Sequence, residues 1–122
     1  MSEIISERFN GELYDNIDCP IRVLGEVLGK KWVGKIIWNI KDNKKRFGEL
    51  QRILKGCSKK VLSQQLELLI SYEIIINEKH EMGNTIESFY YLSEKGRELV
   101  PIIAMMIEWG QDIMKCNSKV ID

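Results

Sequence analysis

The segment FGELQRILKGCSKKVLSQQLELLISY, residues 47–72, decides the fold. Apolar residues spaced three and four apart predict a short helix over residues 47–54 and a longer helix over residues 59–72. Gly56 can end the first helix because glycine readily adopts positive φ, and Ser58 can cap the second. Two helices joined by a short glycine-containing turn are typical of a helix-turn-helix unit.

The second of these helices has two chemically different sides. Its expected buried stripe consists of Leu62, Leu66 and Leu69. A rotation of about 100° per residue places Lys60, Ser63, Gln64 and Glu67 on the opposite side. In helix-turn-helix proteins the first residues of this helix lie nearest the base edges, where glutamine can read adenine and lysine can reach guanine. The candidate recognition residues are Ser58, Lys59, Lys60, Ser63 and Gln64.

Two further helices are expected before residue 47. Asp18 or Cys19 can cap the first, over residues 18–28, and Pro20 fits its first turn because the missing N–H costs nothing there. Gly29 closes it, and the second helix covers residues 31–40. Residues 1–16 are polar and are expected to form an arm or a short, loosely held helix. The side chains expected to face inward are Ile21, Leu24, Val27, Leu28, Trp32, Ile36, Ile37 and Ile40.

After residue 73 the spacing of apolar residues changes from a helical period of about 3.6 residues to a strand period of two. Residues 74–79 and 85–92 are rich in β-branched and aromatic side chains, and residues 80–84 between them carry a Gly-Asn turn signal. Ser93 can cap a final helix over residues 94–115, which Pro101 is expected to kink or split. The fold class is therefore α+β, mainly α. It is a winged helix-turn-helix domain over residues 17–115, with a two-stranded wing at 73–92, terminal dimerisation helices and a tail at 116–122.

The final helix is apolar on nearly every side. A helix that is apolar all round is buried all round, and a domain of this size has only two or three packed layers. A second subunit is therefore expected to cover this helix, although a path through the centre of a monomer remains open. The expected dimer-interface residues are Leu99, Ile103, Met106, Ile107, Trp109 and Ile113.

The charges of the chain are segregated. The formal net charge is zero, but residues 30–60 hold eleven basic and two acidic residues, a net +9, which leaves −9 for the remainder. Such a distribution suggests a face that meets a polyanion, although a lysine-rich solvated helix face would look the same. Lys44, Lys45 and Arg46 are the candidates for contacts with the DNA backbone. Lys79, His80 and Asn84 are the candidates in the wing.

Several classes of protein are excluded by composition. The longest apolar stretch, at residues 99–107, contains Pro101 and is far shorter than the roughly 20 residues that a bilayer requires. The start of the chain has no basic segment followed by an apolar run, so a secretory signal is not expected. Three cysteines at spacings unlike those of zinc sites indicate free thiols in the cytoplasm. No nucleophile or base surrounds His80, the only histidine, so neither an enzyme, a cofactor nor a metal is expected.

Four motifs occur in a fixed order. They are Cys19-Pro20; GKKW at 29–32 leading to IIWNI at 36–40; RFGEL at 46–50 followed by GCSKKVLSQQL at 56–66; and YYLSEKG at 90–96. Together they resemble the HxlR-type family of winged-helix regulators, which are relatives of the MarR proteins. Family members often carry prolines at the wing tip, where this chain has Met82-Gly83-Asn84. The position of Cys57 is usually aliphatic.

The resemblance implies a homodimeric transcriptional regulator that binds double-stranded DNA at an inverted repeat. It also implies a possible redox sensor, since some members sense oxidants or electrophiles through a cysteine at the position of Cys19. Cys19 could equally be a plain capping or packing residue, because nearby Asp15 and Asp18 would raise its pKa. The effector that the resemblance implies is an oxidant, an electrophile or a small molecule.

A second function remains open. A winged-helix module can serve protein–protein assembly, with its basic face against an acidic partner and without direct reading of DNA. Such a module would expose apolar or aromatic anchors on the helix over residues 59–72. This chain has Lys, Ser and Gln there instead, which favours DNA.

Overall fold

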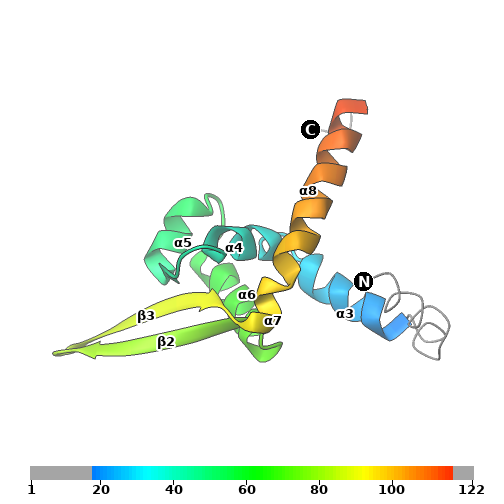
Figure 1. The fold of residues 1–122 in the computed structure, drawn as a ribbon. Helices are drawn as coiled ribbons and strands as arrows, with labels where there is room; N and C mark the ends of the chain where they lie inside the picture. The colour runs from blue at the N-terminus through cyan, green and yellow to red at the C-terminus, as the bar shows by residue number, and fades with distance from the viewer. Residues whose placement is uncertain (1–17, 117–122) are drawn as a thin grey trace. The chain divides into compact units, whose positions relative to one another are not determined.

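A computed structural model describes residues 18–116, and the side chains of residues 20–115, of this chain (Figure 1). The chain separates into two compact units, residues 1–31 and residues 32–122. The predicted N-terminal arm at 1–16 lies outside the described residues, as do residues 117–122 of the predicted tail. None of the described helices is both long enough and apolar enough to span a membrane.

In the first unit, helix α3 spans Asp18–Leu28. Pro20 lies in its first described turn, and Gly29 N donates to Gly25 O at 2.9 Å as the helix closes. The prediction that Ile21 and Leu24 are buried is wrong, because they are 61% and 44% exposed. The described part of this unit contains no second element that could cover them.

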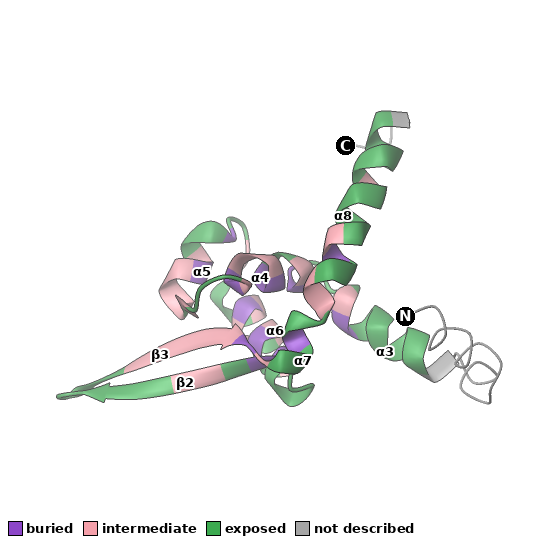
Figure 2. Ribbon diagram, viewed as in Figure 1, coloured by how far each residue is buried: buried purple, intermediate pink, exposed green. Residues whose placement is uncertain are grey.

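The second unit begins with helix α4, Val33–Ile40, which starts two residues later than predicted. Trp32 occupies the N-cap position without a capping hydrogen bond from its side chain. The predicted inward side is confirmed, since the residues expected there are all buried: Trp32, Ile36, Ile37 and Ile40. Figure 2 shows buried residues gathered in α4, α6 and the adjoining ends of the wing strands, so α4 belongs to the core.

The predicted helix-turn-helix pair is present as α5, Phe47–Ile53, and α6, Lys59–Ser71. Gly56 has φ +91° in the turn between them, a conformation in which a Cβ would be strained. The leucine stripe of α6 is buried as predicted. Leu50 of α5 and the following Leu54 are buried, whereas Ile53 is 43% exposed.

The wing belongs to a three-stranded antiparallel sheet, not to the two-stranded hairpin that was predicted. Its strands are β1, Lys45–Arg46, β2, Ile75–Met82, and β3, Thr85–Leu92, in the order β1-β3-β2. The loop predicted at 80–84 shrinks to a two-residue turn, since Met82 pairs directly with Thr85. Gly83 has φ +65° at the first central position of that turn, which suits glycine.

The predicted final helix is split, as the proline suggested. Helix α7, Glu94–Arg97, is followed by α8, Leu99–Cys116, with Pro101 in the first turn of α8. Ser93 caps α7 by accepting a hydrogen bond from Gly96 N at 3.0 Å. The Ser93 hydroxyl also donates to the carbonyls of Glu73 and Ile74, at 2.6 and 3.0 Å. This joins the start of α7 to the segment between α6 and β2.

Candidate nucleic-acid interface

The first turn of α6 is fixed by a side-chain cap. Ser58 has extended backbone geometry, and its Oγ accepts a hydrogen bond from Val61 N at 3.1 Å. The same residue's carbonyl accepts from Leu62 N at 2.9 Å, so the first helical turn is ordered from Ser58 onward. The predicted cap is confirmed. The beginning of α6 therefore presents its polar side chains from a rigid helix end.

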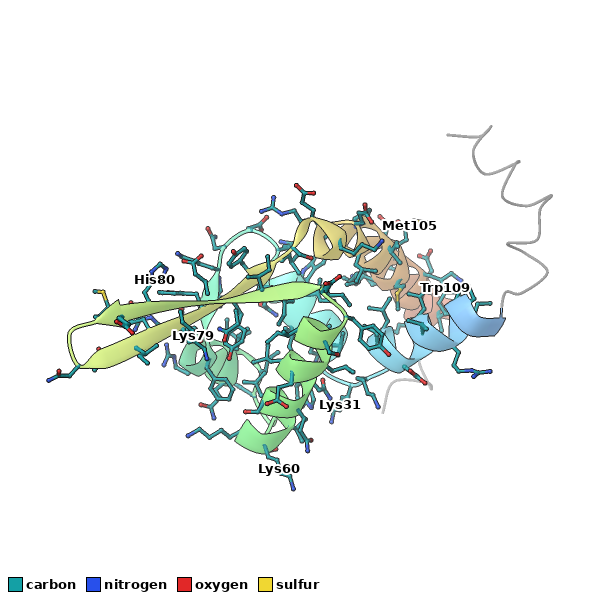
Figure 3. The ribbon with its side chains drawn as sticks, turned by 90° about the horizontal axis from the view of Figure 1, so that it is seen from below. Lys31, Lys60, Lys79, His80, Met105 and Trp109 are labelled. Atoms are coloured by element: carbon teal, nitrogen blue, oxygen red, sulfur yellow. The ribbon has the colours of Figure 1, made fainter. Side chains whose placement is uncertain are left out.

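The exposed side of α6 carries the polar residues predicted for it. Lys59, Lys60 and Gln64 are exposed, and Ser63 is half-buried. Figure 3 shows Lys60 pointing away from the rest of the unit. Since the opposite stripe of leucines is in the core, the orientation of the helix leaves these groups free to meet a ligand. Their hydrogen-bonding chemistry matches base edges and phosphates.

The basic residues before α5 lie in or beside a strand. Lys45 and Arg46 form β1, where they pair with Tyr90 and Phe89 of β3, and Lys44 immediately precedes it. Arg46 N also donates to Glu49 Oε1 at 3.1 Å, which helps to begin α5. All three residues precede the helix-turn-helix in the sequence, but no local pattern indicates that Lys45 and Arg46 join the wing sheet.

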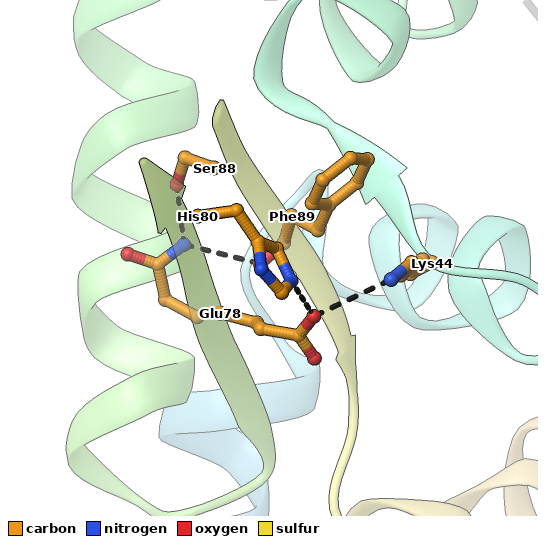
Figure 4. A network of polar contacts seen from close by, with 6 residues as sticks. Lys44, Glu78, His80, Ser88 and Phe89 are labelled. Carbon is orange, nitrogen blue, oxygen red and sulfur yellow. Dashed lines mark hydrogen bonds and ion pairs between the residues drawn. The ribbon is translucent and has the colours of Figure 1, made fainter. Parts of the chain in front are cut away.

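Two of these cations are paired with carboxylates of the wing. Lys44 Nζ lies 3.3 Å from Glu78 Oε1, and Arg46 Nη2 contacts Glu87 Oε1 (Figure 4 draws the first pair). Glu78 also contacts His80 Nε2. The hydrogen bond from His80, together with Lys44, lowers the pKa of Glu78 below its ordinary value, while partial desolvation acts in the opposite direction. Glu78 is therefore ionised near neutral pH.

Of the three wing candidates, only His80 lies in a different place from that expected, since Lys79 is expected in the first strand and Asn84 in the turn. Lys79 and His80 lie within β2, opposite Ser88 and Glu87, so His80 is not in the hairpin loop. Asn84 alone of the three lies in the turn. Because side chains alternate along a strand, Lys79 and His80 point to opposite faces of the sheet. All three are exposed.

Sequence reasoning missed the wing carboxylates Glu78 and Glu87 and the ring of Phe89. A signal for them existed. A two-residue turn at Gly83-Asn84 fixes the register of the hairpin, and that register places Glu78 opposite Phe89. The pairing of β1 with β3 had no such signal, because β1 is only two residues long.

Helix α8 exposes one continuous apolar stripe. Its members are spaced three or four residues apart: Ile102, Met105, Met106, Trp109 and Ile113. Met105 and Trp109 are each 69% exposed, and Figure 3 labels both on this helix. The expectation that α8 is apolar on nearly every side is too broad, since Glu108, Gln111 and Asp112 occupy a polar sector.

The other apolar side of α8 faces the core only in its N-terminal part, since Ile107 and Met114 further along it are 38% and 45% exposed. Ile103 is buried in the core, at 4% exposure, and Leu99 is half-buried. Little of Ile103 remains for a partner, although it was among the expected interface residues. Ile102 and Met105 were absent from that set and are exposed. A helical-wheel count that starts at Ile102 groups these residues on one side of the helix, but it does not say which apolar side is buried.

The three cysteines are separate in the sequence, and only one side chain is described. Cys57 is half-buried beside the cap of α6, with its Sγ 3.7 Å from Ser58 O. Cys19 belongs to α3 and Cys116 ends α8, but their side chains lie outside the described residues. Among the side chains that are described, no group of three His, Cys, Asp or Glu could hold a metal ion.

Comparison with known proteins gives one consistent result. The family model described as HxlR-like helix-turn-helix matches residues 27–118. YybR of Bacillus subtilis, described as an uncharacterized HTH-type transcriptional regulator, is 37% identical over 109 residues, which are 88% of this chain and 84% of that protein. The HTH-type transcriptional regulator YodB of the same organism is 30% identical over 109 residues, covering 88% of this chain and 96% of that protein.

Solved structures agree with the sequence relatives. The redox regulator HypR in its reduced form superposes with a TM-score of 0.75 at 32% identity, covering 82% of this chain and 98% of that one. The reduced form of YodB from B. subtilis gives a TM-score of 0.69 at 29% identity, covering 80% and 92%. The winged helix-turn-helix fold, the motifs and these relatives lead to one assignment: the chain belongs to the HxlR-like helix-turn-helix family, whose named relatives are transcriptional regulators.

Proposed function

We propose that this chain is a sequence-specific DNA-binding transcriptional regulator that acts as a homodimer. One observation carries the proposal: α6 buries its leucines and exposes Lys59, Lys60 and Gln64 from a capped helix end. The first two turns of its exposed side carry no aromatic anchor of the kind a protein-binding surface needs. A role in protein–protein assembly therefore gains no support from this surface.

In the proposed complex the N-terminal half of α6 enters the major groove. Gln64 is placed to read an adenine through two hydrogen bonds, and Lys60 to reach the O6 and N7 of guanine. Lys59 and Ser63 serve bases or phosphates, and the N–H groups after Ser58 face a phosphate. Lys44, Lys45 and Arg46 contact the DNA backbone, with Lys79, His80 and Asn84 of the wing beside them. These contacts set affinity and register without reading sequence.

The homodimer follows from the exposed stripe of α8. Monomeric proteins seldom expose a continuous apolar surface of this extent, and a second copy of the stripe would cover it. Met106, Ile107, Trp109 and Ile113 are the expected contacts that the single chain leaves exposed. A two-fold dimer presents two identical recognition helices. The operator should then be an inverted repeat with half-site centres about 10 base pairs apart, or a multiple of that.

The decisive experiment is selection of genomic DNA fragments by the purified full-length protein, followed by sequencing and footprinting. Recovery of a shared inverted repeat, protected symmetrically and bound at least about 1,000-fold more tightly than random duplex, is the expected result. Recovery of fragments without a common sequence would refute sequence-specific regulation. An asymmetric footprint would refute the two-fold arrangement.

An oxidant response through Cys19 is a second part of the proposal. It is supported by the place of Cys19 near the beginning of α3, and by the redox regulator HypR among similar structures. A thiol near unsatisfied helix N–H groups has a lowered pKa and reacts faster as the thiolate. Mass spectrometry of thiol modification, alongside DNA binding, should show Cys19 reacting before Cys57 and Cys116. If Cys19→Ser loses DNA on oxidation just as wild type does, Cys19 is not the sensor.

A further inference from the structure

The DNA-backbone candidates Lys44 and Arg46 already hold anions in the free chain. Glu78 from β2 pairs with Lys44, and Glu87 from β3 pairs with Arg46. The two carboxylates are the less exposed members of their pairs, at 32% and 29% against 48% and 50% for the two cations. Each cation therefore has a local partner, and a phosphate must displace it.

Phe89 holds this arrangement together. Arg46 and Glu78 are its register partners on either side, so the three side chains lie on one face of the sheet. Lys44 Nζ lies 4.6 Å and Arg46 Cζ 5.3 Å from the centroid of the Phe89 ring, distances at which a cation is attracted to the ring. The rings of His80 and Phe89 meet edge to face with their centroids 6.0 Å apart, and His80 also contacts Glu78.

The two ion pairs should affect phosphate contacts but not base contacts. A cation paired with a carboxylate loses that attraction when it turns to a phosphate, so part of the gain from the phosphate is cancelled. Binding to duplex DNA of non-specific sequence depends mainly on contacts between cations of the protein and phosphates. The cost therefore acts on every DNA sequence alike, whereas base contacts made by Gln64 and Lys60 are unaffected.

We propose that Glu78 and Glu87 compete with DNA phosphates for Lys44 and Arg46, and thereby lower the affinity of the protein for all duplex DNA. Phe89 keeps each cation close to its carboxylate and within reach of the solvent. This inference rests on the proposed DNA-binding function.

A double-mutant cycle tests it on the full-length protein. The probe is a fluorescein-labelled 30-base-pair duplex of random sequence in a buffer of low, fixed salt, so no operator is needed. Glu78→Gln should raise affinity about three- to tenfold, and Glu87→Gln by a similar factor. Glu81→Gln is the matched control. It removes the same charge from the same strand, but Glu81 is exposed and has no ion-pair partner among the described residues, so its gain should be under twofold.

The second arm of the cycle separates pairing from general charge. In a Lys44→Gln background, Glu78→Gln should raise affinity no more than Glu81→Gln does, because the cation to be released is gone. Equal gains for Glu78→Gln and Glu81→Gln in the wild-type background would overturn the inference while leaving DNA binding intact. Reduced affinity in Glu78→Gln would overturn it too, since the carboxylates would then be positioning the cations for DNA. Failure of the wild type to bind any duplex would instead refute the proposed function.

Discussion

Helices α6 and α8 both place aliphatic side chains in the core of the second unit, yet their outer surfaces differ in chemistry. On α6 the side opposite Leu62 and Leu66 carries lysine and glutamine. On α8 the surface beside buried Ile103 carries the stripe that includes Met105 and Trp109. Both surfaces are exposed in the single chain, and their different chemistry suits them to different kinds of ligand. A polar surface can exchange water for base edges and phosphates, whereas an apolar stripe gains most when a like stripe covers it.

Trp109→Glu should give the largest effect, because it places a charge in the exposed apolar stripe of α8. A charge buried between two copies of the stripe without a partner is strongly unfavourable. The protein should be monomeric at about 10 μM by sedimentation velocity. Its affinity for the full operator should fall by about 100-fold or more, because each half-site then binds alone.

Glu108→Gln is the control for that variant, since Glu108 lies in the polar sector of the same helix. It should remain dimeric and bind DNA normally. A Trp109→Glu protein that stays dimeric would show that the stripe serves something other than self-association.

Gln64→Ala tests whether the polar side of α6 reads bases. Loss of a bidentate base contact costs about 1–3 kcal/mol of discrimination, or about 5- to 150-fold at one base pair of each half-site. Selection from random duplexes should show the preference relaxed at that position and retained elsewhere. Gln111→Ala, the same substitution in the polar sector of α8, should leave all preferences unchanged. A similar loss in both variants would mean that Gln64 does not read a base.

Lys45→Ala separates the contribution of phosphate contacts to affinity from the reading of bases. With four or five phosphate contacts from each subunit, the wild-type slope of log K against log salt should be roughly −7 to −9. Lys45→Ala should weaken binding to all sequences alike and reduce this slope by about two per dimer, one for each lysine removed from a phosphate. Lys115→Ala, near the end of α8, should leave the slope unchanged, and Gln64→Ala should nearly do so. A wild-type slope near zero would contradict the electrostatic account.

Ser58→Ala should have the smallest effect. Removal of an N-cap costs about 1 kcal/mol, which corresponds to a fall in Tm of about 3–5 °C for a domain of this size. Calorimetry at fixed protein concentration measures the fall in Tm, and Ser58→Thr should recover most of the lost stability. An unchanged Tm would indicate that the Ser58–Val61 hydrogen bond adds nothing to the stability of α6.

Local patterns predicted most of this fold. The leucine stripe of α6, the Ser58 cap and the split near Pro101 each depend on a few neighbouring residues, so the sequence contains the whole signal. The residue types on the exposed side of α6 followed from the same periodicity. The hairpin was also evident, although its loop was overestimated because His80, Glu81 and Met82 form β strand despite weak strand propensity.

Non-local contacts could not be predicted in the same way. Strand β1 exists because two residues pair with β3 more than forty positions later in the sequence, and nothing in Lys45 or Arg46 indicates a strand. The ion pair between Arg46 and Glu87 depends on that pairing. The burial of Ile103 and the exposure of Ile102 likewise depend on how α8 lies against α4.

The close packing at Ser93 and Gly96 limits which residues can replace them during evolution. A Cβ at position 96 would lie 2.1 Å from the carbonyl oxygen of Ile74, a distance at which the backbone would have to move apart. That same carbonyl accepts hydrogen bonds from both the backbone N and the hydroxyl of Ser93. Position 96 is therefore closed to every residue except glycine, and position 93 admits little beyond serine or threonine. Mutational drift in descendants of this chain should therefore avoid these two sites.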